Sequence, residues 1–213
     1  NTGTISITVN TANITSLTFL YLNSLNTGTI SITVNTANIT SLTSLTLHNL
    51  NTGTISITVN TANITSLTSL ALYNLNTGTI SITVNTANIT SLTFLYLNSL
   101  NTGTRSLTIN PKDITGAITN IDMQNIGAGA TIDLSYTTGK TWANNQNTVR
   151  MIVATGGLTS TEVDNMLIEL ANVSTWTGSK LINLTGAGNG ARTAASDAAV
   201  ATLVGKGVTV TTN

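Results

Sequence analysis

The chain contains no cysteine, and its first 104 residues carry no Asp, Glu, Lys or Arg side chain. The missing cysteines exclude disulfide bonds and metal sites built from thiolates. The seven basic residues of the chain are not clustered, so we expect neither a nucleic-acid partner nor an anionic membrane surface. The longest apolar run is far shorter than the roughly 20 residues of a transmembrane helix, so we expect no membrane insertion.

Four tandem units of 25 residues fill residues 1–100, and the first 18 positions of each read NTGTISITVNTANITSLT. A fixed period of this length is typical of solenoid proteins. One unit cannot bury its apolar residues alone, whereas stacked units form a continuous core. We therefore assign residues 1–126 to a repeat solenoid with four near-identical units and a divergent fifth.

Each repeat contains two segments with the pattern of a β-strand. TISITVN alternates polar and apolar residues, which predicts a half-buried strand with Ile5, Ile7 and Val9 inward. A second short strand is expected around Leu20 and Leu22, between turns with apolar residues three positions apart. We also expect Asn and Thr side chains at equivalent positions to form hydrogen-bonded ladders between coils.

The leucine spacing resembles the leucine-rich repeat pattern L-x-x-L-x-L-x-x-N/C-x-L in a shortened form, in which the last leucine arrives one residue early. The segments LTSLTLHNL and LTSLALYNL carry the resemblance, which is to a short, Thr/Asn-rich bacterial or phage-like variant of that family. The matching residues are Leu17, Leu20, Leu22 and Leu25 in the first copy and Leu42, Leu45, Leu47 and Leu50 in the second.

This resemblance implies a β-solenoid of leucine-rich-repeat type. Many members of the family carry a helix opposite the leucine strand, whereas TISITVN predicts a strand there, so we expect parallel sheets on two faces. In leucine-rich repeat proteins the sheet of leucine strands is the concave one and is the usual ligand surface.

The four copies differ at only four positions. The first three alternate with the leucines, so they share the strand face that points away from the core. Neutral drift would also have changed the exposed positions of TISITVN, which are invariant, and the residues used are typical of binding surfaces. We therefore predict a ligand-binding face made of Phe19, Tyr21, Asn23, Ser24, Ser44, Thr46, His48, Asn49, Ser69, Ala71, Tyr73, Asn74, Phe94, Tyr96, Asn98 and Ser99.

The repeat decays after residue 100, and every formal charge lies at or beyond Arg105. The segment ITGAITNIDMQNI keeps four apolar residues in the leucine rows. Thr159–Glu162 has the sequence of a capping box before an apolar stripe, and TAASDAAVATLVGKG predicts a second helix between the strands SKLINLTGAG and VTVTT. We predict that residues 127–213 form divergent coils and a C-terminal α/β capping region that closes the core.

The sequence offers no catalytic constellation. His48 is the only histidine and no carboxylate precedes Asp113, so we expect no enzyme activity and no catalytic residues. Asp113, Asp122 and Asp133 would suit calcium if neighbouring coils brought them together, but solvated carboxylates of the cap are favoured. The GAGNG segment at 186–190 lacks the Lys of a phosphate loop and is expected to be a flexible turn. We expect neither a cofactor nor a metal.

These patterns favour a non-enzymatic recognition module, a surface adhesin or a phage tail-fibre-like receptor-binding protein. Its uncharged Thr, Asn and Ser surface suits an extracellular, cell-surface or virion-surface location, and its expected partner is a cell-surface glycan or protein. One alternative is a structural spacer or fibre-forming repeat protein. A lesser alternative is an ice-binding protein, because TISITVN repeats a Thr-x-Ser-x-Thr row at strand spacing. The N-terminal coil has no comparable cap, so self-association through that end is also expected.

Overall fold

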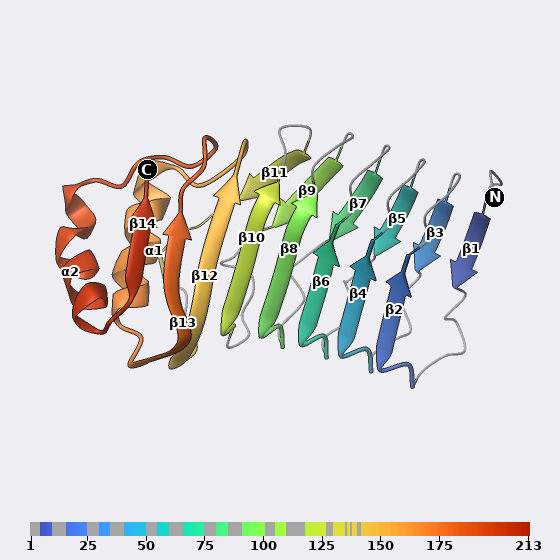
Figure 1. Cartoon of the computed structure of the whole chain (residues 1–213), viewed down its shortest axis with the longest axis horizontal. Coiled ribbons are helices and arrows are strands. Elements are labelled where there is room, and N and C mark those ends of the chain that lie inside the picture. The colour runs from blue at the N-terminus through green and yellow to red at the C-terminus, as the bar shows by residue number, and fades with distance from the viewer. Residues whose placement is uncertain are drawn as a thin grey trace.

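The computed structural model stacks parallel strands side by side along the molecule, with two helices at the end opposite the N-terminus (Figure 1). It describes residues 5–9, 16–24, 30–34, 41–49, 55–59, 66–74, 80–84, 91–100, 105–109, 118–126, 130–134, 136, 138–139 and 142–213.

Each repeat contributes one strand to each of two parallel sheets. The first sheet contains β1 (Ile5–Val9), β3 (Ile30–Val34), β5 (Ile55–Val59) and β7 (Ile80–Val84). The second contains β2 (Phe19–Asn23), β4 (Ser44–His48), β6 (Ser69–Tyr73) and β8 (Phe94–Leu100). The described strands thus form an open, solenoid-like arrangement with parallel sheets on two faces, as the two strand patterns predict.

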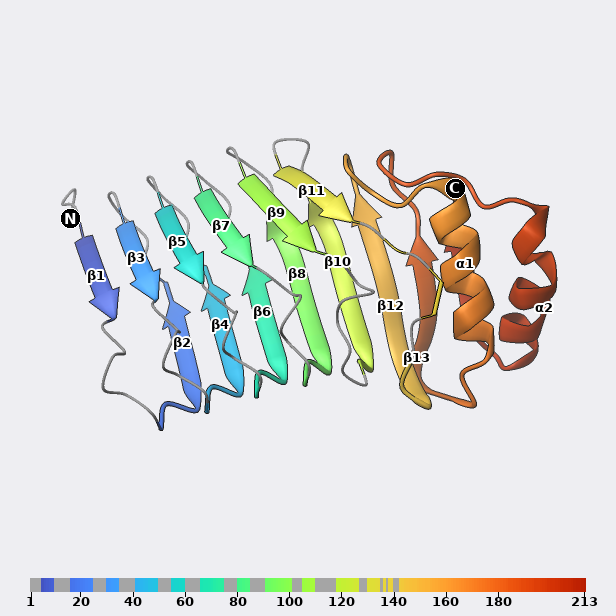
Figure 2. The same cartoon turned by 180° about the vertical axis from the view of Figure 1, so that it is seen from behind.

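The second sheet continues beyond the repeats to a total of eight strands. β10 (Asn120–Ile126), β12 (Asn145–Val153), β13 (Thr175–Leu184) and β14 (Thr209–Thr212) follow β8 in that order. A separate pair, β9 (Arg105–Ile109) and β11 (Ala130–Leu134), lies in the layer of β7 (Figure 2). The eight-stranded sheet therefore continues into residues whose sequence no longer follows the 25-residue repeat.

The register of the second sheet pairs each residue with its equivalent one repeat later. Leu20 pairs with Leu45, Leu45 with Leu70 and Leu70 with Leu95. The register then continues from Leu95 to Ile121, which accommodates the extra residue of the fifth unit. Identical side chains are thus stacked at the strand spacing of about 4.8 Å.

These stacked leucines form the core, as predicted from their spacing. The buried members of the rows are Leu42, Leu45, Leu47, Leu67, Leu70, Leu72, Leu92, Leu95, Leu97, Ile118, Ile121, Met123 and Ile126. Leu17, Leu20 and Leu22 are only partly buried, because the first coil has a neighbour on one side only. The side chains of Ile5, Ile7 and Val9, and the residues Leu25 and Leu50, lie outside the described part of the chain.

A threonine ladder ties successive coils together beside the leucine core. The Thr43 hydroxyl donates to the Thr18 carbonyl oxygen at 3.0 Å, and the same bond recurs from Thr68 to Thr43 and from Thr93 to Thr68. Each of these carbonyls also accepts the backbone N–H of the threonine one coil later. The invariant Ser-Leu-Thr of each repeat is therefore part of the structural frame.

Helix α1 (Ser160–Ala171) begins at the predicted capping box. Thr159 accepts from the backbone N–H of Glu162, and the Glu162 side chain accepts from that of Thr159. The predicted apolar stripe is fully buried and consists of Val163, Met166, Leu167 and Leu170. Figure 2 shows α1 on the face of the eight-stranded sheet that carries β9 and β11, so the helix continues the layer of the first sheet.

The second predicted helix is divided in the structure. A 3-10 turn, Ala194–Ser196, precedes α2 (Asp197–Gly205). The buried carboxylate of Asp164 in α1 accepts from the backbone N–H of Thr193 at 3.0 Å and from the hydroxyls of Thr193 and Ser196 at 2.6 Å each. These bonds hold the chain in a turn, so the α-helix begins only at Asp197.

The same network sets the ionisation of Asp164. Burial by itself raises the pKa of this carboxyl, but the hydrogen bonds from Ser196 and Thr193 outweigh that effect and hold the pKa below its ordinary value. Within the described residues, neither helix approaches the length and apolarity needed to cross a membrane.

Candidate ligand-binding face

The variable side chains of the second sheet point away from the core. Along β4 and β8 the leucines are buried, whereas the residues between them are partly exposed. Phe19 and Tyr21 in β2 are 69% and 57% exposed, which makes them the most exposed large aromatic residues described. The alternation expected from the sequence is therefore present in β2, β4 and β8.

An aromatic row crosses four strands on this outer face. The Tyr21 hydroxyl lies 3.4 Å from Nδ1 of His48, whose ring stacks on Tyr73 with centroids 4.0 Å apart. Tyr73 then contacts Tyr96 edge to face at 5.5 Å, and Tyr96 lies beside Phe94 at 6.1 Å with planes 22° apart. Residues from all four repeats are thus brought into one continuous surface.

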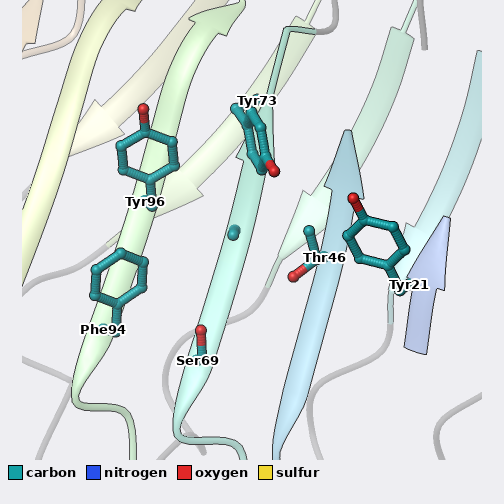
Figure 3. A pocket seen from close by; sticks show the side chains of 7 residues that line it. Tyr21, Thr46, Ser69, Tyr73, Phe94 and Tyr96 are labelled. Atoms are coloured by element: carbon teal, nitrogen blue, oxygen red, sulfur yellow. The ribbon is translucent and has the colours of Figure 1, made fainter. Parts of the chain in front are cut away.

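A pocket of about 490 Å³ is hollowed into this surface, and we call it the aromatic trough (Figure 3). Its lining residues are Tyr21, Thr46, Ser69, Ala71, Tyr73, Phe94 and Tyr96. The trough exists because β4 and β6 carry small residues where β2 and β8 carry Phe and Tyr. The variation between repeats therefore produces a cavity as well as a change of surface chemistry.

Ala71 lies at the bottom of the trough and is only 8% exposed. The residue lies on the outer face, as the sequence predicts, but larger side chains of the neighbouring strands cover it. The equivalent positions in the first and fourth repeats are Tyr21 and Tyr96, so a tyrosine at position 71 would occupy the space of the trough. Sequence reasoning alone did not reveal this burial, because it depends on the side chains of other repeats.

The trough offers hydroxyl groups and aromatic faces without any formal charge. Burial of Tyr73, together with the nearby hydroxyls of Tyr21 and Tyr96, raises the pKa of Tyr73 above its ordinary value. Its hydroxyl is therefore protonated at neutral pH and is available as a hydrogen-bond donor. None of the lining residues is a carboxylate or a cationic side chain, so the trough carries no charged acid or base.

The amide of Asn98 positions the ring of Tyr96. Its Nδ2 donates to the Tyr96 hydroxyl at 2.7 Å, and its Oδ1 accepts from Ser99 Oγ at 2.7 Å and from Asn125 Nδ2 at 3.3 Å. Asn98 belongs to the predicted face, but in this structure it serves to orient another member of it.

The fourth variable position directly follows β2, β4 and β6 and is the second-last residue of β8. Ser24, Asn49, Asn74 and Ser99 all have φ between 52° and 57°, the left-handed region in which Asn is enriched. Their backbone position is fixed by the next coil, since Ser24 N–H donates to the His48 carbonyl at 3.1 Å. These residues must therefore adopt the left-handed backbone conformation, in addition to the binding role predicted for them.

The third and fourth variable positions change together for a local reason. In the first and fourth repeats Ser Oγ donates to the preceding Asn Oδ1 at 2.7 Å, as in Asn23–Ser24. In the middle repeats, which carry His48 and Tyr73, Asn74 Nδ2 instead donates to Asn49 Oδ1 at 3.1 Å. In the sequence, Asn and Ser occur together at these two positions in the first and fourth repeats, which indicates that the two positions change together.

The outer face changes from aromatic to charged immediately after β8. Asp122 is the register partner of Tyr96 and forms an ion pair with Arg150 at 2.8 Å. Asp113 and the side chain of Asp133 lie outside the described residues, and no cluster suited to a metal ion occurs among the side chains that the structure does describe. Of the three aspartates of the conceivable calcium site, only Asp122 has a described side chain, and it is paired with Arg150.

The trough and the aromatic row consist of side chains at variable positions of the repeat, carried by a frame whose core and threonine ladder are constant. Comparison with protein-family models, with curated proteins and with solved structures finds no match to this chain.

Proposed function

We propose that this protein is a non-enzymatic recognition module that binds its ligand on the outer face of β2, β4, β6 and β8. The observation that carries the proposal is the aromatic trough. Residues that differ between otherwise identical repeats meet there in one pocket, and its volume lies within the range of small-ligand sites.

The constant and the variable positions of each repeat have different structural roles, and this difference supports the proposal. The constant residues form the leucine core and the threonine ladder, so changes there would destabilise every coil. The first three variable positions project outward, so they tolerate exchange without opening the core. Such a surface is suited to diversification, and Tyr, His, Ser and Asn are typical of adaptable binding sites.

We further propose a surface adhesin or a phage tail-fibre-like receptor-binding protein, outside the cell or on a virion, with a cell-surface glycan or protein as partner. The charge-free solenoid and its Thr, Asn and Ser surface support this setting. We also propose that the solenoid is of the leucine-rich-repeat type. Short parallel strands with stacked, buried leucines support that assignment, as does a helix that replaces a strand in the opposite layer.

A structural spacer is a second candidate, favoured by the identical register of every described repeat. A spacer function would not depend on the aromatic residues of the trough. The ice-binding alternative would use the other sheet, in which Thr8 pairs with Thr33 and Ser6 with Ser31. Thermal hysteresis in a solution of the protein would favour that candidate.

The test of the proposal is a screen for binding to a glycan array and to intact cells. The wild-type chain is compared with the triple variant Tyr21→Ser, Tyr73→Ser and Tyr96→Ser, which removes rings from the outer face and leaves the leucines unchanged. We expect the triple variant to retain its circular dichroism spectrum and to lose binding.

A matched set of substitutions provides the control. Thr4, Thr29, Thr54 and Thr79 lie outside the described residues, and their sequence assigns them to the start of the other strand of each repeat. Their replacement by Ser is expected to leave binding intact. Binding that survives the tyrosine changes but is lost with the threonine changes would overturn the proposal.

A further inference from the structure

We infer that the aromatic trough binds a short neutral saccharide, stacked on Phe94 and Tyr96 and admitted by the small side chain of Ala71. This inference rests on the recognition function proposed above and specifies the ligand class of the same site. Three features of the trough carry it: a two-ring platform, a floor of hydroxyl groups and the absence of charge.

Phe94 and Tyr96 form the platform. They are two residues apart on β8, their centroids are 6.1 Å apart and their planes differ by only 22°. Figure 3 shows both rings with their faces toward the viewer, one above the other along the strand, whereas Tyr73 is seen edge-on beside them. Two adjacent ring faces suit two linked pyranose rings, whose C–H faces are apolar.

The floor supplies the polar contacts that sugar hydroxyls need. Thr46 and Ser69 line the trough, and in the described part of the chain their hydroxyls have no hydrogen bond within the protein. The hydroxyls of Tyr21, Tyr73 and Tyr96 surround the same space. A ligand rich in hydroxyl groups can form hydrogen bonds with these side-chain hydroxyls, whereas a purely apolar ligand would leave them without partners.

The backbone around the trough does not favour an extended peptide. β4 is hydrogen-bonded to β2 and β6 on its two sides, and β6 to β4 and β8. A peptide that recognises a sheet by strand addition needs a free edge, which the floor of the trough lacks. Recognition here must therefore depend on side chains.

The charge distribution favours a neutral ligand. No lining residue is charged, and Arg150, in β12 two strands beyond β8, already pairs with Asp122. An acidic saccharide would bring a carboxylate or sulfate to a surface with no cation to receive it. Binding is therefore expected to be insensitive to salt, which screens interactions between charges.

The length of the site also limits the ligand. From β2 to β8 there are three strand spacings, or about 14 Å. This span runs across the strands. Two sugar rings stacked along β8 on Phe94 and Tyr96 leave it for one further ring toward β2, so a disaccharide or a trisaccharide fits the trough.

The experiment uses variants built from residues that the repeats themselves carry at these positions. Ala71→Tyr introduces the residue of the first and fourth repeats and fills the trough. Phe94→Ser introduces the residue of the second and third repeats and removes half of the platform. Phe19→Ser is the matched control, because Phe19 occupies the same position of its repeat but does not line the trough.

Isothermal titration calorimetry is performed at low and high salt with trisaccharides of glucose, mannose and N-acetylglucosamine, and with galacturonic acid trisaccharide as the charged probe. We expect at least one neutral probe to bind with a salt-independent affinity. Ala71→Tyr and Phe94→Ser should abolish this binding, and Phe19→Ser should preserve it. Circular dichroism confirms that each variant is folded.

Retention of neutral-saccharide binding by folded Ala71→Tyr would overturn the inference. So would tighter, salt-dependent binding of the galacturonic acid probe. If no saccharide binds, but a protein ligand from the cell screen requires Tyr21, Tyr73 and Tyr96, the saccharide inference is wrong and the recognition function stands. If no ligand depends on these tyrosines, both are wrong.

Discussion

Replacing Leu70 by Ala should destabilise the solenoid strongly, because Leu70 lies in the middle of the stacked leucine core. It is 1% exposed, and the register places Leu45 on one side of it and Leu95 on the other. The substitution removes three carbon groups, each worth about 0.8 kcal/mol of transfer free energy. The sheet holds both neighbours in place, so a residual cavity adds about 1–2 kcal/mol. We expect a total loss of about 3.4–4.4 kcal/mol in the free energy of unfolding.

The matched control is Leu20→Ala, the same substitution at the same register position in β2. Leu20 is only partly buried and has Leu45 as a neighbour on one side, so we expect a loss of about 1–2 kcal/mol. Urea unfolding is followed by circular dichroism, which reports all strands, and by tryptophan fluorescence. Trp142 and Trp176 are buried in the C-terminal part, so fluorescence reports the capping region. Equal losses for the two variants, or no loss for Leu70→Ala, would refute the continuous core.

Two further predictions concern helix α1. Asp164→Ala should cost about 2–4 kcal/mol, because the hydroxyls that donate to this carboxylate lose a charged acceptor. The pKa of Asp164 is lower in the folded state, so its stabilising effect is present above about pH 4 and is lost as the pH falls through the lowered value. Urea titrations of both proteins from pH 7 downward should therefore converge, and a constant difference would contradict this account. Thr159→Ala removes the N-cap of α1 and should cost about 1 kcal/mol in thermal unfolding; an unchanged melting temperature would refute the role of the capping box.

The repeat frame could be predicted from the sequence because its determinants are local and periodic. Alternating leucines identify a strand with one buried face, and stacking follows from the fixed repeat length. Ile121 and Met123 could be placed in the same rows despite an inserted residue, and both are buried. The capping box at Thr159 also depends only on residues within one helical turn.

The aromatic trough could not be predicted in the same way, because it arises from differences between repeats. Each outward residue could be placed on its face, but the burial of Ala71 depends on rings carried by other strands. Similarly, the left-handed φ of Ser24 is set by the path of the backbone after β2, and Ser has no strong preference for the left-handed region.

The GAGNG segment is a turn, as predicted, and it packs closely against distant parts of the chain. Asn189 is buried, and its Nδ2 donates to the carbonyl oxygens of Met151 at 2.7 Å and Leu184 at 2.9 Å. A Cβ atom on Gly190 would lie 2.4 Å from the backbone nitrogen of Ser160, so the glycine is required for close packing. Sequence reasoning missed this because the contacts come from distant parts of the chain.

The central claim is that ligands bind on the outer face of β2, β4, β6 and β8, and His48 offers the most direct test of it. His48 is the only histidine of the chain, and its ring stacks on Tyr73 within the aromatic row. Its ring-proton NMR signals can therefore be followed without assigning the repeats. When a ligand identified in the screen is titrated into the wild-type protein, these signals should shift and saturate with the same dissociation constant as binding. Saturable binding that leaves the His48 signals unchanged would contradict the claim.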